Sequence, residues 1–382
     1  MASESRLFQP LKLTPRITLG HRLALAPLTR YRADDDHVPL IPLVQTYYSQ
    51  RAASLPGTLL VTEATFISPT AGGYDNVPGI WNSEQAAAWK RVTDAVHAKG
   101  GFIFCQLWSL GRVAKPEIAA REGFAVHSSS AVKNPDDPNA PVPKEMTVEE
   151  IKARIGEYAA AAKLAVEEAG FDGVEVHGAN GYLIDQFLQD TCNKRTDEYG
   201  GSVEKRARFA LEVVKAVVDA VGAERTAIRL SPWSRFQGMR MEDPIPTFSY
   251  LIKELNGLGL AYLHMIRERT ELGVTAEEED IERSLDFAVE LWDGPFLVAG
   301  GLTPKEARRV VDEQYKDKPV VGVFGRYWIS NPDLPFRIRE GIELNPYNRS
   351  TFFLPKSPVG YIDQPFSKEF EALHGRQQEV LN

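Results

Sequence analysis

Short apolar runs alternate along the chain with segments of helical period. Eight runs rich in Val, Ile, Leu and Phe are predicted strands, at 22–28, 59–67, 101–108, 173–178, 226–232, 261–267, 295–302 and 320–326. Amphipathic helical patterns lie between many of them, at 84–100, 148–170, 202–222, 248–259, 282–292 and 304–315. This alternation predicts a parallel sheet, and eight continuous apolar strands favour an α/β fold closed into a single (β/α)8 TIM barrel over an open doubly wound sheet.

Two segments depart from the alternation. Residues 109–145 are rich in Pro, Asn, Asp and Ser without a helical period, which predicts a long capping insertion after the third strand that covers or lines a site. The aromatic, turn-rich residues 344–382 predict a packed C-terminal extension and not a second domain. We therefore expect residues 1–382 to form a single domain.

Composition and charge narrow the class of protein. The 382 residues are 43% hydrophobic and 25% charged, which is typical of a globular chain with a substantial core. The net charge of -8 is not gathered into long runs, so we expect a small-molecule partner, with no nucleic acid and no membrane. Two cysteines, Cys105 and Cys192, supply neither a disulfide framework nor a cysteine zinc site. Without a recognisable targeting segment, the expected location is cytoplasmic.

In such a barrel, residues at the carboxyl ends of the strands face the active site. That rule selects Pro27, Leu28, Thr29, Gln106, Trp108, His177, Asn180, Tyr182, Arg229, Gly300, Gly301, Gly325 and Arg326. Arg229 is the most informative, because a guanidinium in an otherwise apolar strand is costly unless an anion or several acceptors meet it. Its partner is either a ligand or an internal carboxylate such as Glu175 or Glu63.

Gly300–Gly301 and Gly325–Arg326 end the seventh and eighth strands, where barrels frequently hold a phosphate. The alternative is a pair of ordinary tight turns with a surface arginine.

His177, Asn180 and Tyr182 lie within six residues of one another at the end of the fourth predicted strand. No carboxylate or second histidine stands at ligand spacing, so we expect no metal site. A neutral imidazole beside a carboxamide is instead a donor pair suited to polarising a carbonyl or phenolate oxygen, with the phenol as a weak acid. A well-bonded strand-to-helix turn remains the alternative reading of the same three residues.

Several common motifs are missing. The chain has no G-x-G-x-x-G after a strand, no G-x-S-x-G and no G-K-[ST] loop, which argues against a Rossmann dinucleotide site, a hydrolase and an NTPase. No predicted strand carries a lysine, which argues against a Schiff-base aldolase. A ligand-binding protein without turnover stays open.

Six segments together resemble the old yellow enzyme family, the FMN-dependent ene-reductases. They are APLTRYRA (26–33), QLWSLGR (106–112), HGANGYLIDQFLQDTCNKRTDEYGGS (177–202), RLSPW (229–233), AGGLT (299–303) and GRYWISNPDLP (325–335). The resemblance spans nearly the whole chain and is closest to the fungal and plant branch that includes oxophytodienoate reductases. Thr29, where a bacterial branch uses Cys, argues against that branch.

The resemblance implies a cofactor site for non-covalent FMN. Thr29 would contact the flavin C4 carbonyl, Gln106 the pyrimidine edge, and Arg229 the N1–C2=O side where the reduced ring is negative. The full implied set is Pro27, Leu28, Thr29, Gln106, Arg229, Ala299, Gly300, Gly301, Gly325 and Arg326, with the last five around the phosphate. Some relatives have Asn at the position of Gly301, so a side-chain contact is lost there.

The resemblance also implies the reaction. His177 and Asn180 would hold the oxygen of an α,β-unsaturated carbonyl, the flavin N5 would deliver hydride to the β-carbon, and Tyr182 would protonate the α-carbon. Trp108, Phe236 and Tyr347 match aromatic positions of the substrate pocket, with plain packing as the alternative.

NADPH or NADH would reduce the flavin at the face that later receives the substrate. Enones, enals, nitro-olefins and quinones are the implied substrates. Relatives that isomerise often carry Phe in place of Tyr182, so the retained Tyr favours net reduction. The physiological substrate, the choice between NADPH and NADH, and the choice between monomer and homodimer are left open. The loops 109–145 and 268–281 are expected to set substrate preference.

Overall fold

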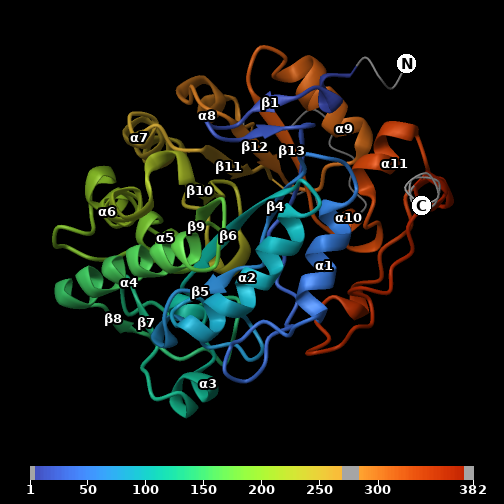
Figure 1. The fold of residues 1–382 in the computed structure, drawn as a ribbon. Helices are drawn as coiled ribbons and strands as arrows, with labels where there is room; N and C mark the ends of the chain where they lie inside the picture. Colours follow the sequence, from blue (N-terminus) through green and yellow to red (C-terminus); the bar gives the residue numbers. More distant parts are fainter. Residues whose placement is uncertain (1–4, 269–283, 374–382) are drawn as a thin grey trace.

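The computed structural model describes residues 5–268 and 284–373, and within them the predicted barrel is present (Figure 1). Its eight parallel strands are β3 (Leu23–Leu25), β4 (Leu59–Val61), β6 (Phe102–Trp108), β9 (Gly173–Gly178), β10 (Thr226–Leu230), β11 (Tyr262–Ile266), β12 (Phe296–Ala299) and β13 (Val320–Phe324). The sheet closes because β13 pairs with β3 and β4 pairs with β6. The second predicted run is broken, and its end forms the short strand β5 (Thr65–Phe66) beside β6.

The strands read as continuous apolar runs because both of their faces are buried. On β10, Ala227 belongs to the cluster inside the barrel, whereas Ile228 belongs to the larger cluster between the sheet and the helices. A hairpin of β1 (Leu11–Lys12) and β2 (Thr18–Leu19) adds its leucines to the interior cluster. The amide of Gly20 donates to the carbonyl of Gly57 just before β4, so the hairpin closes the amino-terminal end of the barrel.

The predicted helices surround the barrel (Figure 1). They are α2 (Ser83–His97), α4 (Val148–Glu167), α6 (Val203–Val221), α7 (Ile245–Asn256), α8 (Asp286–Leu291), and α9 (Pro304–Arg308) with the π-helical turn Arg309–Gln314. The hydroxyls of Thr147 and Thr303 close capping boxes at α4 and α9, and the hydroxyl of Ser202 accepts from the amide of Lys205 at α6. None of the helices in the described ranges has the length and apolarity needed to cross a bilayer.

Further helices lay outside the predicted set. They are α1 (Leu43–Ala52), α10 (Arg326–Ser330) and α11 (Leu334–Glu340). The short helix α5 (Leu183–Leu188) directly follows Tyr182, at the strand-to-helix turn that the sequence indicated. The helix α1 lacks an apolar stripe because it buries Arg51, whose guanidinium donates to the carbonyls of Tyr47 and Ile329 at 3.0 and 2.9 Å. An amphipathic pattern cannot identify a helix that buries a cation.

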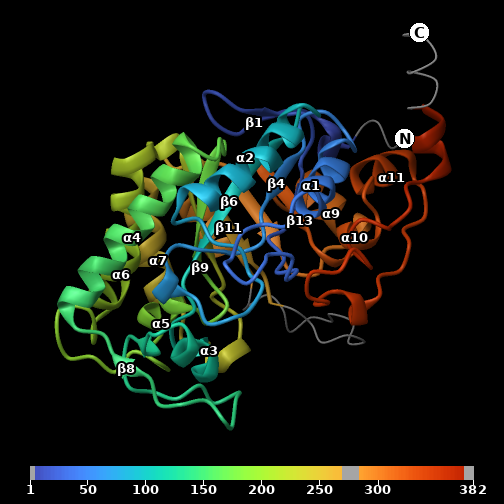
Figure 2. The ribbon, with the colours of Figure 1, turned by 60° about the horizontal axis from the view of Figure 1, so that its bottom comes forward.

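The insertion 109–145 contains short elements that its sequence did not indicate. It contains α3 (Pro116–Arg121), a 3-10 turn (Gly111–Val113), and β7 (His127–Ser128), which pairs with β8 (Lys144–Glu145). The six residues of α3 are too few to show a helical period. Figure 2 shows α3 and β8 gathered at one end of the barrel.

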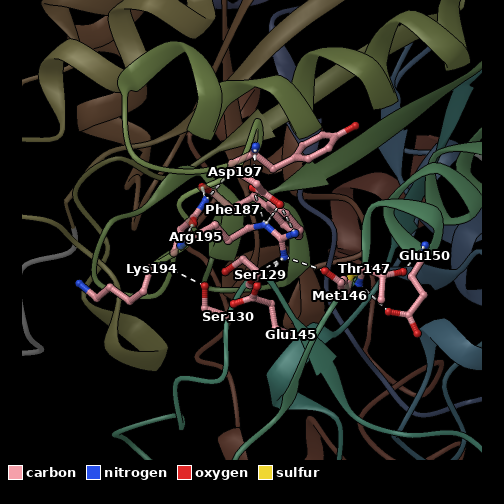
Figure 3. A network of polar contacts seen from close by, with 12 residues as sticks. Ser129, Ser130, Glu145, Met146, Thr147, Glu150, Phe187, Lys194, Arg195 and Asp197 are labelled. Atoms are coloured by element: carbon pink, nitrogen blue, oxygen red, sulfur yellow. Dashed lines mark hydrogen bonds and ion pairs between the residues drawn. The ribbon is translucent and has the colours of Figure 1, made fainter.

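A buried arginine fastens this insertion to the loop that follows α5 (Figure 3). Arg195 Nη1 donates to the carbonyls of Ser129, within the insertion, and Met146, just after it, at 2.9 and 2.7 Å. Its Nε and Nη2 bind the carboxylate of Asp197 at 3.0 and 2.5 Å, and the guanidinium lies 6.0 Å from the ring of Phe187. The segment R-T-D-E-Y-G-G-S (195–202) therefore has a structural role, because its arginine holds the insertion in place.

Replacing Arg195 by Leu is expected to lower the free energy of unfolding by about 2–4 kcal/mol, because two carbonyls lose their donor at roughly 1–3 kcal/mol each. Arg208→Leu is the matched control, because the ion pair between Arg208 and Glu198 is long and exposed and should contribute less than about 1 kcal/mol. Equal shifts of the denaturation midpoint in the two variants would contradict this stabilising role of Arg195.

Part of the C-terminal extension packs on the barrel. Tyr361 is fully buried and stacks on Tyr47 with ring centroids 4.1 Å apart. Arg30 Nη2 donates to the carbonyl of Gly360 at 2.7 Å, which ties the extension to the end of the first barrel strand. Residues 374–382 of the predicted extension lie outside the described residues.

Candidate active site

Neighbouring strands bring several predicted site residues into register at the carboxyl end of the barrel. Arg229 on β10 is the strand partner of His177 on β9 and of His264 on β11. Gln106 on β6 is the partner of Glu175 on β9. These five side chains belong to four adjacent strands, so the barrel rule correctly selected Gln106, His177 and Arg229 as neighbours.

His177 is a neutral donor. Its Nδ1 accepts from the amide of Ala179 at 3.3 Å, which leaves the proton on Nε2. Burial lowers the pKa of His177 well below its usual value, and the charge of Arg229 and the nearby His264 lower it further. The imidazole therefore stays uncharged and offers an N–H to an acceptor.

Asn180 is held by a strained and well-bonded turn. Its backbone is left-handed, with φ 59°, and its amide donates to Ser231 Oγ at 2.8 Å. The next amide, of Gly181, donates to Asp185 Oδ2 at 2.8 Å. No described residue hydrogen-bonds to the carboxamide of Asn180, so this side chain can donate to a ligand. The turn is well bonded, as one reading of the sequence expected, and it also presents a donor.

Tyr182 lies against both aromatic neighbours of the site. Its ring centroid is 4.7 Å from that of Trp108 and 5.0 Å from that of His177. Burial raises the pKa of Tyr182, and Tyr31 raises it further, whereas a hydrogen bond with the Gln237 side chain and the charge of Arg229 oppose the rise. The phenol is protonated throughout the physiological range and can act only as an acid.

The three aromatic residues predicted for the pocket lie in different places. Trp108 is fully buried beside Tyr182 and His177. Tyr347 is half-buried and lies 5.4 Å from the guanidinium of Arg326. Phe236 is 57% exposed. In the described part of the chain, neither Phe236 nor Tyr347 stacks on His177 or Tyr182, so packing supports only Trp108 as a neighbour of the donor group.

Three neighbours of the site escaped the sequence reasoning. The ring of Tyr74 lies 5.9 Å from that of Trp108. Tyr31 and Gln237, which both influence the pKa of Tyr182, have left-handed backbones with φ 58° and 63°. Tyr31 stands only two residues after Thr29, and that proximity was the one available signal. Left-handed conformations of large residues cannot be read from sequence.

The carboxylates named as internal partners of Arg229 have other contacts. Glu175 Oε2 lies 2.8 Å from His264 Nδ1, and its Oε1 accepts from Gln106 Nε2 at 2.7 Å. Glu63 accepts from the amide of Arg30 at 3.0 Å. Burial raises the pKa of Glu175, but His264, and after it the charge of Arg229 and the hydrogen bond from Gln106, outweigh burial and lower the pKa of that carboxyl.

The glycine-rich strand ends form an open corner beside a cation. After β12, Gly300 and Gly301 have φ 123° and 77°, conformations that favour glycine. A methyl group on Gly301 would meet only the guanidinium of Arg326, at 3.8 Å, so the space in front of this backbone is free. Leu28 borders the same corner, because a methyl group on Gly325 would lie 3.2 Å from its side chain. Backbone amides beside an arginine suit a phosphate.

These residues fit FMN. The open Gly301–Arg326 corner suits the phosphate, and the buried cation Arg229 beside the neutral Gln106 suits a ring that becomes negative on reduction. A neutral donor pair and a protonated phenol at the same mouth suit an oxygen-bearing substrate. In the described ranges, no three His, Cys, Asp or Glu side chains gather as a metal site. The fold and these residues at the carboxyl end of the barrel define a flavin-dependent oxidoreductase on a (β/α)8 barrel.

Comparison with known proteins gives the same class. The NADH:flavin oxidoreductase / NADH oxidase family matches residues 6–345, and the chain belongs to this family. A chanoclavine-I aldehyde reductase of Penicillium roqueforti (strain FM164) is 55% identical over 370 residues, which are 96% of this chain and 98% of that protein. A probable inactive reductase of Epichloe festucae var. lolii is 51% identical, covering 99% of this chain and all of that protein.

A solved structure agrees. The crystal structure of Old Yellow Enzyme from Pichia sp. AKU4542 superposes with a TM-score of 0.88 at 38% identity, over 96% of this chain and 95% of that one. The predicted resemblance to the old yellow enzyme family, the barrel and the assignment as an FMN oxidoreductase are confirmed.

Proposed function

We propose that the protein is an NAD(P)H-dependent ene-reductase that reduces the activated C=C bond of α,β-unsaturated carbonyl compounds. The observation that carries the proposal is the contact between a neutral His177, whose Nε2 bears the proton, and a protonated Tyr182. Non-covalent FMN, once reduced by NADPH or NADH, supplies the hydride that the substrate accepts at its β-carbon. The remaining steps belong to side chains of this chain.

His177 Nε2 and the Asn180 carboxamide would bind the carbonyl oxygen of the substrate. As negative charge develops on that oxygen, both hydrogen bonds strengthen, so the pair binds the transition state better than the substrate. Tyr182 would give its proton to the α-carbon, because an enolate carbon is more basic than a phenolate. Trp108 excludes water from one side of these groups.

For the cofactor we propose the residues of the strand ends. Arg229 would offset the negative charge of the reduced ring, and Gln106 and Thr29 would contact its polar edges. Ala299, Gly300, Gly301, Gly325 and Arg326 would surround the phosphate, with Pro27 and Leu28 beside them. The position of Tyr347 over Arg326 supports a place near the phosphate more than in the substrate pocket.

A role in fungal specialised metabolism is favoured by the relatives. One is named as a chanoclavine-I aldehyde reductase and another, from a Cladobotryum species, as an aldehyde reductase, which supports unsaturated aldehydes as substrates. Tyr182 favours net reduction over isomerisation in this chain. Product analysis with an enal distinguishes the outcomes: we expect the saturated aldehyde, and an isomerised enal or an alcohol would contradict this assignment.

Steady-state kinetics test the shared site. The chain lacks a dinucleotide-binding motif of its own, so NADPH and the enone must occupy the same face in turn, as in ping-pong kinetics. Initial-rate plots against NADPH at several cyclohexenone concentrations are expected to be parallel. Intersecting lines without substrate inhibition would show that the two ligands bind together, and the proposal of one shared face would be wrong.

A further inference from the structure

Glu175 is a buried carboxylate at the centre of the strand-end group. It is fully buried, it is the strand partner of Gln106, and it accepts from Gln106 Nε2 at 2.7 Å and contacts His264 Nδ1 at 2.8 Å. The proposed reaction uses neither Glu175 nor His264. A buried carboxylate is costly, so its retention inside a barrel calls for a physical reason.

The charges around Glu175 are nearly balanced. Burial lowers the pKa of His264, which leaves an imidazole that donates from Nδ1 to the carboxylate. Its Nε2 then carries no proton, and this nitrogen is buried without a hydrogen-bond partner among the described residues. His177 is also neutral. The ionised Glu175 and Arg229 are therefore the two charges of this group, and they have opposite signs.

Glu175 also orients an amide. Because Gln106 turns its Nε2 toward the carboxylate, its Oε1 is left for a ligand, and no described residue donates to that oxygen. Gln106 can therefore meet a flavin edge as an acceptor through Oε1. An acceptor suits the N–H of a flavin pyrimidine edge.

We propose that Glu175 is a positioning residue that lowers the reduction potential of the bound flavin, since its charge offsets that of Arg229 and its Oε1 fixes the orientation of the Gln106 amide. The inference rests on the proposed function. A cation near the ring stabilises the negatively charged reduced form, and a carboxylate beside that cation weakens the effect. The position of Glu175 thus tunes how readily NADPH reduces the flavin and the flavin reduces the substrate.

The test is the midpoint potential of the FMN-loaded protein, measured by anaerobic titration against a reference dye. Glu175→Gln removes the charge at constant volume and is expected to raise the preference for reduced over oxidised FMN by about tenfold, which is about 30 mV for a two-electron couple. Glu212→Gln is the matched control, because Glu212 lies on α6, where it accepts from Lys152 and Tyr199, and its replacement should change the ratio less than about twofold.

A second variant keeps the test decisive if Glu175→Gln does not fold. His264→Leu removes a hydrogen-bond donor of Glu175, so the carboxyl is expected to take up a proton more readily and the potential to rise in the same direction. An unchanged potential in either folded variant overturns the inference. If the native protein takes up no FMN, the proposed function fails first. If the native protein binds FMN that NADPH can reduce, and the variants have the same midpoint potential as the native protein, only this inference fails.

Discussion

The Tyr182→Phe variant is expected to reoxidise with an enone about 10²–10⁴ times more slowly than the native protein, which is the usual contribution of a positioned acid. Reduction of the flavin by NADPH should change by less than about twofold, because no proton from this phenol is needed there. The ring remains, so its packing on Trp108 and His177 is kept.

Stopped-flow absorbance follows the two half-reactions separately. Tyr74→Phe is the matched control, since this phenol also adjoins Trp108 but lacks the contact with His177. It should leave both rates nearly unchanged. Equal losses of both half-reactions in Tyr182→Phe would mean that the residue shapes the site without donating the proton.

Replacing His177 by Leu is expected to slow enone reoxidation about 10²–10³-fold, because one of two donors to the developing oxyanion is lost. Flavin content should be retained, since the proposed cofactor contacts come from other residues. His21→Leu removes another buried imidazole, which hydrogen-bonds Thr58, and serves as the control for nonspecific effects. A similar slowing in both variants would contradict a donor role for His177.

The protonation of His177 adds a pH test of the same assignment. Its pKa is lowered by burial, by Arg229 and by His264, so the neutral form persists below the ordinary value of 6.5. Enone reoxidation in the native protein is therefore expected to be flat between about pH 6 and 8. A decline as the pH rises through about 6.5 would show that the imidazolium is the reactive donor.

The same lowered pKa affects stability. Below pH 6.5 the unfolded chain binds a proton at this histidine that the folded chain does not bind. His177 therefore destabilises the folded state progressively as the pH falls below 6.5, and this contribution disappears above that value.

The barrel was predictable because the burial of each strand shows in the strand's own sequence. A strand such as β10, with Ala227 facing inward and Ile228 facing the helices, must be apolar on both faces, and eight such runs separated by helices leave few topologies. Capping residues such as Thr147 marked helix starts for the same reason. The helix α1 was missed because its buried Arg51 depends on a carbonyl distant in sequence, that of Ile329.

The candidate site was predictable where position along a strand decides it. His177 and Arg229 stand at strand ends, and the barrel brings strand ends together. Contacts that depend on loops were not predictable. Gln237 reaches Tyr182 from a left-handed turn, and the hydrogen bond of Glu175 with His264 depends on which strands are neighbours. Of the loop 268–281 expected to set substrate preference, residues 269–281 lie outside the described residues.

An anaerobic titration of the purified protein tests the central claim most directly. We predict a yellow protein that releases FMN on denaturation, loses its flavin absorption band when NADPH is added without oxygen, and regains it when cyclohexenone follows. Folded protein that is colourless and takes up no added FMN, or a band that NADPH bleaches and no enone, enal, nitro-olefin or quinone restores, would contradict it.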